Sequence, residues 1–336
     1  MVFLGTPSVA AGVLSALIDA EGVLGAKVVA AVTSPAKRQG RGKILTATPV
    51  EVLARDRYIP HVLTPVNARD PVFLESVRSL NPDLCVTAAY GHVLPEEFLE
   101  MPRLGTLNIH PSLLPSWRGA APVQRSIEAG DPVTGVSVAY TVYAMDAGPI
   151  AAQVEYAPGD DEMSEELLKH LFTVGTDALI SDVLPRVFSG TLTQASAVLQ
   201  DEAKATKAKK LRKEEGFVNF ASCEAAALHN KVRAFAGWPG TSATFDIGGE
   251  SFIVKIMKTR KVVSKVEGLS LEPGSVTLSK QGVFVTCGEG TVVELIAVQP
   301  PNKKVINASD WVRGMQGKTI KAVETTALAA PRATPH

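Results

Sequence analysis

The chain of 336 residues has little cysteine and no long apolar run, and each shortage excludes a class of protein. Its three cysteines, Cys85, Cys223 and Cys287, lie far apart and form no CxxC pair. A disulfide framework and a structural zinc site are therefore not expected, and a reducing compartment fits. No apolar run approaches the roughly 18–20 residues that a membrane-spanning helix needs. With 46% hydrophobic and 20% charged residues, the composition excludes a disordered or rod-like chain.

A net charge of zero hides an uneven distribution. Residues 1–200 hold 14 Lys and Arg against 21 Asp and Glu, whereas residues 201–336 hold 20 against 13. The second part therefore carries a net charge of +7, and six of its basic residues lie between 204 and 213. This split favours two domains, of which the basic one meets a polyanion. A solvated basic linker explains the same charges equally well.

Strand and helix patterns alternate over the first two-thirds of the chain. Short apolar runs predict strands at 1–5, 26–32, 84–89, 104–109, 136–142 and 150–156. Capping residues and helical spacing predict helices at 48–57, 70–80, 121–129 and 165–188. The alternation predicts an α/β domain over residues 1–189, with a doubly wound, mostly parallel sheet.

The composition changes after residue 189. Residues 190–210 are small, polar and basic, which predicts a linker. A short helix at 228–235 and five short strands with Gly turns between them predict an OB-like β-barrel over residues 211–322, a fold that often binds nucleic acids. Residues 323–336 are expected to form a disordered tail.

Sequence motifs for nucleotide cofactors and catalytic metals are missing. The first strand–helix turn, Gly5-Thr6-Pro7-Ser8, lacks the GxGxxG pattern of dinucleotide-binding folds. GxSxG and HExxH are absent, and the six histidines are scattered. We therefore expect neither a nicotinamide or flavin cofactor nor a metal site.

The most informative segment surrounds Asn108 and His110. Two residues apart on a predicted strand, they point to the same face, and Pro111 ends the ladder directly after them. Such a strand end is where open α/β sheets bind ligands. An amide donor beside an imidazole that titrates near neutral pH suits carbonyl chemistry. Asp146 follows in a turn between two strands, where an aspartate bonding its own backbone explains it better when taken alone.

Three motifs together resemble the folate-dependent formyltransferases. They are Asn108-Ile-His-Pro-Ser-Leu-Leu-Pro115, Trp117-Arg-Gly-Ala-Ala-Pro122 and Asp146-Ala-Gly-Pro149. The segments Gly40-Arg-Gly-Lys43 and Asn230-Lys-Val-Arg-Ala-Phe235, with Trp238-Pro239, are similar to the members that act on methionyl-tRNA, so that the resemblance covers about residues 1–320.

This resemblance implies an enzyme that takes a formyl group from 10-formyltetrahydrofolate, without a metal, and gives it to methionyl-tRNA. Asn108, His110 and Asp146 would form the catalytic trio. The implied folate-binding residues are Ser112, Leu113, Leu114, Pro115, Tyr90 and Gly91. The implied tRNA-binding residues are Lys37, Arg38, Arg41 and Lys43, in a loop that a merely solvated segment also explains, and Lys207, Lys209 and Lys210. A monomer is expected.

The chain departs from the family pattern at Pro111, where many members have glycine. Its segments 228–239 and 306–311 are closer to plant and algal organellar members, and no targeting segment precedes the first strand. We therefore expect a mitochondrial or plastid enzyme, with the bacterial cytoplasm as the alternative. Two other functions stay open. Another folate-dependent amine formyltransferase is disfavoured by the +7 second part, and a non-enzymatic RNA-binding protein is disfavoured by the trio.

Overall fold

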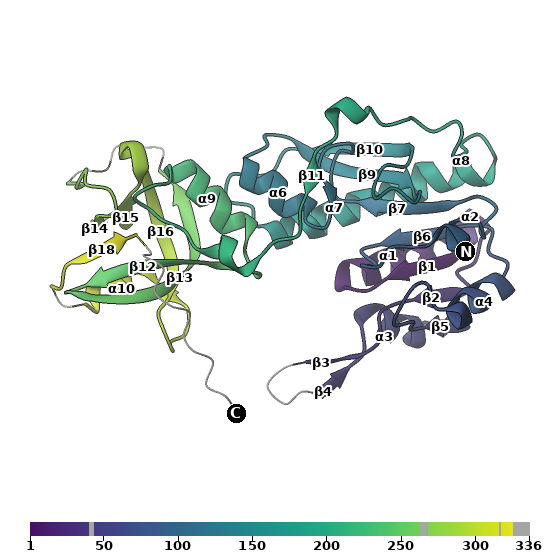
Figure 1. The fold of residues 1–336 in the computed structure, drawn as a ribbon, viewed down its shortest axis with the longest axis horizontal. Helices are drawn as coiled ribbons and strands as arrows, with labels where there is room; N and C mark the ends of the chain where they lie inside the picture. The colour runs from purple at the N-terminus through teal and green to yellow at the C-terminus, as the bar shows by residue number, and fades with distance from the viewer. Residues whose placement is uncertain (40–43, 263–265, 267, 316, 325–336) are drawn as a thin grey trace. The chain divides into compact units, whose positions relative to one another are not determined.

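Strand β1 (Val2–Gly5) lies inside a seven-stranded sheet whose order is β10-β9-β7-β6-β1-β2-β5 (Figure 1). A computed structural model describes residues 1–39, 44–262, 266, 268–315 and 317–324. The chain forms two units, of which unit 1 comprises Met1–Val123, Pro132–Pro158 and Glu166–Lys209, and unit 2 the remainder. The other strands of this sheet, all in unit 1, are β2 (Ala30–Val32), β5 (His61–Leu63), β6 (Cys85–Ala88), β7 (Thr106–His110), β9 (Thr134–Tyr140) and β10 (Ile150–Tyr156).

The sheet is mostly parallel, which confirms the predicted fold class. Strands β7, β6, β1, β2 and β5 run parallel, whereas β9 and β10 form an antiparallel edge beside β7. The chain passes from β1 to β2 on one side and later returns to β6 on the other. Ligands of doubly wound sheets bind at such a switch point, at the carboxyl ends of the strands.

Helices flank the sheet where the sequence predicts them. Thr48 caps α3 (Pro49–Asp56) by accepting from the Glu51 N–H, and Asp70 caps α4 (Pro71–Ser79) by accepting from the Val72 N–H. The helix predicted at 165–188 is α7 (Ser164–Ala178), a π-helical turn η1 (Leu179–Val183) and α8 (Leu184–Phe188). The remaining helices of this part of the chain are α1 (Ser8–Asp19), α2 (Glu21–Leu24), α5 (Glu96–Leu99) and α6 (Pro122–Ala129). No helix in the described ranges is both long and apolar enough to span a bilayer.

Two small two-stranded sheets complete unit 1. Strands β3 (Lys37–Gln39) and β4 (Ile44–Thr46) pair antiparallel and extend from the unit as a hairpin arm (Figure 1). Strand β8 (Arg118–Gly119) pairs in parallel with β11 (Lys207–Ala208), which follows the 3-10 turn η2 (Glu202–Lys204). Residues 190–209, expected as a linker, thus belong to unit 1, and they bury Leu192, Ala197 and Ala208.

Unit 2 contains an antiparallel sheet of order β14-β15-β16-β13-β12-β18, with β17 paired to β16. Bridging between Ser275 and Lys321 joins its two ends, so the sheet is a nearly closed barrel, as predicted. Within its core, the ring of Phe245 packs tilted against Phe220 and edge-to-face against Trp311. Besides most of α6, the elements of unit 2 are η3 (Lys213–Gly216), α9 (Ala225–Ala234), β12 (Thr241–Ile247), β13 (Glu250–Lys261), β14 (Val276–Leu278), β15 (Val283–Thr286), η4 (Gly288–Gly290), β16 (Val292–Gln299), β17 (Ile306–Asn307), α10 (Ala308–Arg313) and β18 (Ile320–Val323). Of the tail predicted at 323–336, Val323 is instead the last residue of β18, and residues 325–336 lie outside the described residues.

Candidate active site

Asn108 and His110 lie on β7 with one residue between them, at the carboxyl end of the strand. Strand β6 pairs with β7 so that Thr87 lies opposite Asn108. The Thr87 hydroxyl donates to Asn108 Oδ1 over 2.8 Å. This bond occupies the amide oxygen and leaves the Nδ2 amino group as the donor of Asn108.

The imidazole of His110 lies between two oxygens. Its Nδ1 is 3.7 Å from Asp146 Oδ1, and its Nε2 is 3.1 Å from the carbonyl oxygen of Trp117. The side chains of His110 and Asp146 are only 6% and 17% exposed, so solvent screens their interaction weakly. A protonated ring in this position directs both of its N–H groups at oxygen atoms.

Asp146 lies in the turn between β9 and β10, in the left-handed conformation with φ 52°. Its Oδ2 accepts the backbone N–H of Gly119 over 2.8 Å. Gly148, two residues later, passes so close to the Tyr140 carbonyl that a Cβ would lie 1.7 Å from that oxygen. The carboxylate of Asp146 is therefore directed toward the loop after β7. An ordinary turn aspartate, in contrast, bonds its own backbone.

Strained backbone is concentrated around this site. Of the seven non-glycine residues with positive φ in the described ranges, three flank it: Ala89 after β6, Trp117 after β7, and Asp146. Left-handed backbone at such residues costs of order 1–3 kcal/mol each and persists where surrounding contacts enforce it. The loops around His110 are therefore held by contacts outside themselves.

The predicted folate-binding segment after β7 is largely inward-facing. Ser112 is fully buried and its hydroxyl donates to the Ser116 carbonyl, while Leu114 is buried against Ala139 and Ile150. Leu113 and Pro115 are half-buried. Ser112 and Leu114 thus shape the loop from inside, and only backbone or partly exposed atoms of the segment can face a ligand.

The second predicted folate-binding segment, Tyr90-Gly91, follows β6 at the switch point. Burial raises the pKa of Tyr90 to about 12, and no hydrogen-bond partner of its hydroxyl lies among the described residues. Gly91 is exposed with φ 82°, a conformation that favours glycine, and a Cβ there would meet nothing within 4 Å. The backbone at Gly91 is thus open to the approach of a ligand.

The predicted tRNA-binding residues occupy two places on unit 1 and one on unit 2. Lys37 and Arg38 are exposed on the β3–β4 arm, whereas Arg41 and Lys43 lie outside the described residues. Lys207 is exposed on β11, and exposed Lys209 and Lys210 follow it at the boundary of the units.

Comparison with known proteins identifies the family of this chain. The formyl transferase family model matches residues 1–183, and the model of the formyl transferase C-terminal domain matches residues 210–316. A methionyl-tRNA formyltransferase of Myxococcus xanthus is 40% identical over 315 residues, 94% of each chain. The chain belongs to the methionyl-tRNA formyltransferase family. Another member, from Chloroflexus aurantiacus, is 36% identical over 96% of this chain and 99% of its own.

Solved structures share the fold of this family member. An N-formyltransferase from Helicobacter canadensis, in complex with folinic acid and dTDP-3-aminofucose, superposes with a TM-score of 0.64 at 15% identity, covering 89% of this chain and 98% of its own. HypX from Aquifex aeolicus gives a TM-score of 0.59 at 18% identity and covers 93% of this chain, but 46% of its own. At these identities the likeness concerns the fold alone.

Sequence reasoning missed the groups that hold the predicted residues in place. Thr87 and Gly119 are examples, because only the pairing of strands and loops shows what they touch. In the described part of the chain, no three His, Cys, Asp or Glu side chains gather in a group suited to a metal ion.

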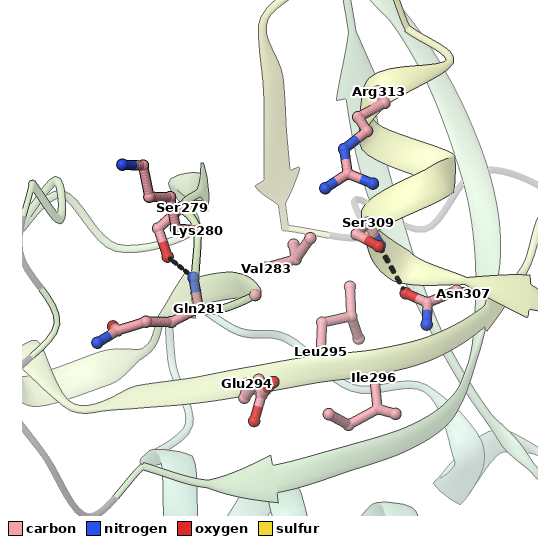
Figure 2. Close-up of a pocket in the computed structure, with 11 residues that line it drawn as sticks. Ser279, Lys280, Gln281, Val283, Glu294, Leu295, Ile296, Asn307, Ser309 and Arg313 are labelled. Carbon is pink, nitrogen blue, oxygen red and sulfur yellow. Dashed lines mark hydrogen bonds between the residues drawn. The ribbon is translucent and has the colours of Figure 1, made fainter.

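A hollow of about 210 Å³ on unit 2 contains none of the predicted site residues. Figure 2 shows Arg313 of α10 on one side, the Ser279–Gln281 turn on the other, and Ile296 of β16 below. Hydrogen bonds within the lining join Ser309 to Asn307 and Gln281 to Ser279. The remaining lining residues are Lys280, Gly282, Val283, Glu294 and Leu295.

Proposed function

We propose that this chain transfers the formyl group of 10-formyltetrahydrofolate to the α-amino group of methionyl-tRNA, with Asn108, His110 and Asp146 as its catalytic residues. The observation that carries the assignment of residues is the packing of His110 against Asp146, beside Asn108, at the carboxyl end of β7. Family membership supports the reaction and both substrates.

The chemistry requires charge stabilisation at one oxygen and removal of one proton. The methionine nitrogen bonds to the formyl carbon, the bond from that carbon to the folate nitrogen breaks, and a proton passes from the amine to the folate nitrogen. Negative charge gathers on the formyl oxygen during attack. Asn108 Nδ2–H and a protonated His110 are donors of the kind that stabilise such a charge.

Asp146 supports His110 in this account. Its carboxylate faces Nδ1 over 3.7 Å, so Nε2 is the ring nitrogen proposed to serve the substrate. For this role, Nε2 exchanges its present contact with the Trp117 carbonyl for one with the substrate. An α-amine has a pKa of about 8, so a useful fraction is already neutral near pH 7.5. The amine therefore needs no metal to act as a nucleophile.

The folate site is proposed at the switch point beside Tyr90 and Gly91, and along the loop Ser112–Pro115. The buried Tyr90 hydroxyl and the open face of Gly91 support this placement. Because Ser112 and Leu114 face inward, their proposed role is to set the loop backbone that meets the folate.

The tRNA is proposed to meet exposed basic side chains in both units. Arg41 and Lys43 join this proposal on the resemblance alone. Phosphate contacts by lysine and arginine release counterions, so affinity should fall as salt rises. We also expect a monomer, to be checked by light scattering of the full chain.

An acceptor comparison tests the function. Labelled formyl donor is offered with methionyl-tRNA, free methionine or an amino-sugar nucleotide, and filter binding of methionyl-tRNA is measured in parallel. Transfer to methionyl-tRNA is the expected result. Transfer to the amino sugar would assign another amine formyltransferase, and binding without transfer to any acceptor would assign an RNA-binding protein.

The compartment stays a proposal as well. The relatives described above are bacterial proteins, whereas segments 228–239 and 306–311 favour a mitochondrial or plastid origin. Localising the product of the complete source gene by fluorescent tagging distinguishes an organelle from the bacterial cytoplasm.

A further inference from the structure

The side-chain amide of Gln200 joins the two loops that hold His110. Its Nε2 donates to the main-chain carbonyls of Asp146 and Gly148, over 2.8 and 2.7 Å. Its Oε1 accepts from Arg118 Nε and Nη2, over 3.0 and 2.7 Å. Gln200 thus links the Asp146 turn to the loop that supplies the Trp117 carbonyl and the Gly119 N–H.

Every hydrogen-bonding group of this amide is used, and only one orientation satisfies them. A flipped amide would place Oε1 against two carbonyl oxygens and Nε2 against a guanidinium, which has donors only. Arg118, whose side chain is 12% exposed, is itself held by Glu202. Arg118 therefore fixes the orientation of the Gln200 amide, and the amide in that orientation donates to the Asp146 carbonyl.

The chain around Gln200 is tied to the same loop by its backbone. Thr206 Oγ1 accepts the Trp117 N–H over 2.8 Å, the Thr206 carbonyl accepts the Arg118 N–H, and the Thr206 N–H donates to the Pro115 carbonyl. The segment 200–208 is therefore fixed to the loop after β7 by hydrogen bonds, and this attachment keeps Gln200 in reach of the Asp146 turn.

We propose that Gln200 is a positioning residue for formyl transfer, acting through Asp146. Asp146 has a left-handed backbone, and its carboxylate must meet both Gly119 and His110. Holding the Asp146 and Gly148 carbonyls fixes where that carboxylate points. Gln200 touches no reacting atom in this account, and the inference rests on the proposed function above.

The test is a double-mutant cycle on the full-length chain. Gln200→Glu keeps the shape and the bond to Arg118 but places a carboxylate oxygen against two carbonyls. We expect kcat with methionyl-tRNA to fall at least 10-fold with KM for the tRNA little changed, because misplaced groups near the chemistry lose rate. Combined with Asp146→Asn, Gln200→Glu should cost no further activity, since both changes disable the same function, which is the support of His110 by Asp146.

The control is Gln194→Glu, the same change at an exposed residue earlier in the chain, which should keep the parent kcat and thermal midpoint. A Gln200→Glu enzyme with parent kcat, or one whose loss adds fully to that of Asp146→Asn, would overturn the proposal. Should Gln200→Glu not fold, Gln200→Met takes its place in the cycle, and failure of that variant to fold would make the role purely structural. A parent enzyme that transfers no formyl group would instead contradict the proposed function.

Discussion

The backbone N–H of Gly119 donates to Asp146 Oδ2, while Asp146 Oδ1 faces Nδ1 of His110. One carboxylate therefore connects the loop after β7 to the imidazole at the end of that strand. The same loop returns to the ring through the Trp117 carbonyl, which lies beside Nε2. His110 is held from both sides by groups that depend on a single loop conformation.

Replacing Gly119 by alanine should disturb this connection. Gly119 has φ 128°, and a Cβ would lie 2.6 Å from the Ala208 carbonyl oxygen. We expect Gly119→Ala to lower the free energy of unfolding by about 1–3 kcal/mol and to reduce kcat, because the β8–β11 pairing must shift. The control is Gly12→Ala in helix α1, where an added Cβ would meet nothing within 4 Å. This change should raise the free energy of unfolding by about 0.5–1 kcal/mol. Denaturant unfolding measures both, and unchanged stability in Gly119→Ala would refute the steric argument.

Removing the Thr87 hydroxyl should slow transfer through Asn108. Thr87→Val keeps the shape of the side chain but loses the bond to Asn108 Oδ1, so the amide can turn its donor away from the substrate. A loss of about 10-fold in kcat is expected, within the cost of misplacing a group near the chemistry. Thr87→Ser, which retains the hydroxyl, should stay near the parent rate. Equal rates for the valine and serine variants would argue that Asn108 needs no such support.

Stability should fall as the solution is acidified through the titration range of His229. Burial lowers the pKa of His229, with the Arg233 charge acting in the same direction; Nδ1 meets Thr259 Oγ1 and Nε2 meets the Asp160 carbonyl. The unfolded chain, with an ordinary histidine pKa of about 6.5, then binds the extra proton first. The neutral ring's stabilisation is therefore complete above that pH and is lost as pH falls toward the lowered folded value.

Unfolding midpoints between pH 5 and 8 check this sign. His229→Gln should flatten the pH dependence, whereas His61→Gln, at an exposed position in unit 1, should leave it unchanged. A parent protein that gains stability on acidification over this range would show that other groups dominate.

Binding of tRNA should depend on salt, and the lysines at 207–210 should affect the reaction differently from Arg41. Replacing Lys207, Lys209 and Lys210 by alanine should weaken binding and flatten the log–log salt slope by about 0.7–0.9 per lost phosphate contact. Turnover at saturating tRNA should change little. Arg41→Ala should lower turnover even at saturation, if the loop places the amine for attack. Binding that is insensitive to salt, or an Arg41→Ala variant that alters only affinity, would contradict this division.

Much of the fold could be predicted because its signals are local. The caps Thr48 and Asp70, the apolar run of β6 and the two-residue spacing of Asn108 and His110 each act within a few residues. Strands such as β18, with four residues near the chain end, carry too little pattern to be found.

The supports of the site could not be predicted, because they join segments distant in sequence. Thr87 meets Asn108 only through the register of β6 and β7, and Gln200 meets Asp146 across 54 residues. The basic composition of residues 190–210 resembles a solvated linker, which conceals the two-residue strand β11. The basic composition that predicts tRNA contacts therefore gives no sign of the strand β11, which supports the site.

Single-turnover transfer of labelled formyl from 10-formyltetrahydrofolate to methionyl-tRNA tests the central claim most directly. The parent chain should yield labelled formylmethionine after the ester bond to tRNA is hydrolysed. His110→Ala and Asn108→Ala should each be slower by ~10²-fold or more, as for loss of an oxyanion donor, with unchanged circular dichroism and thermal midpoint. Asn67→Asp, the same change at an exposed residue, should keep the parent rate of transfer, whereas Asn108→Asp should lower it. A parent-like rate in His110→Ala, or no formylmethionine from the parent chain, would contradict the account.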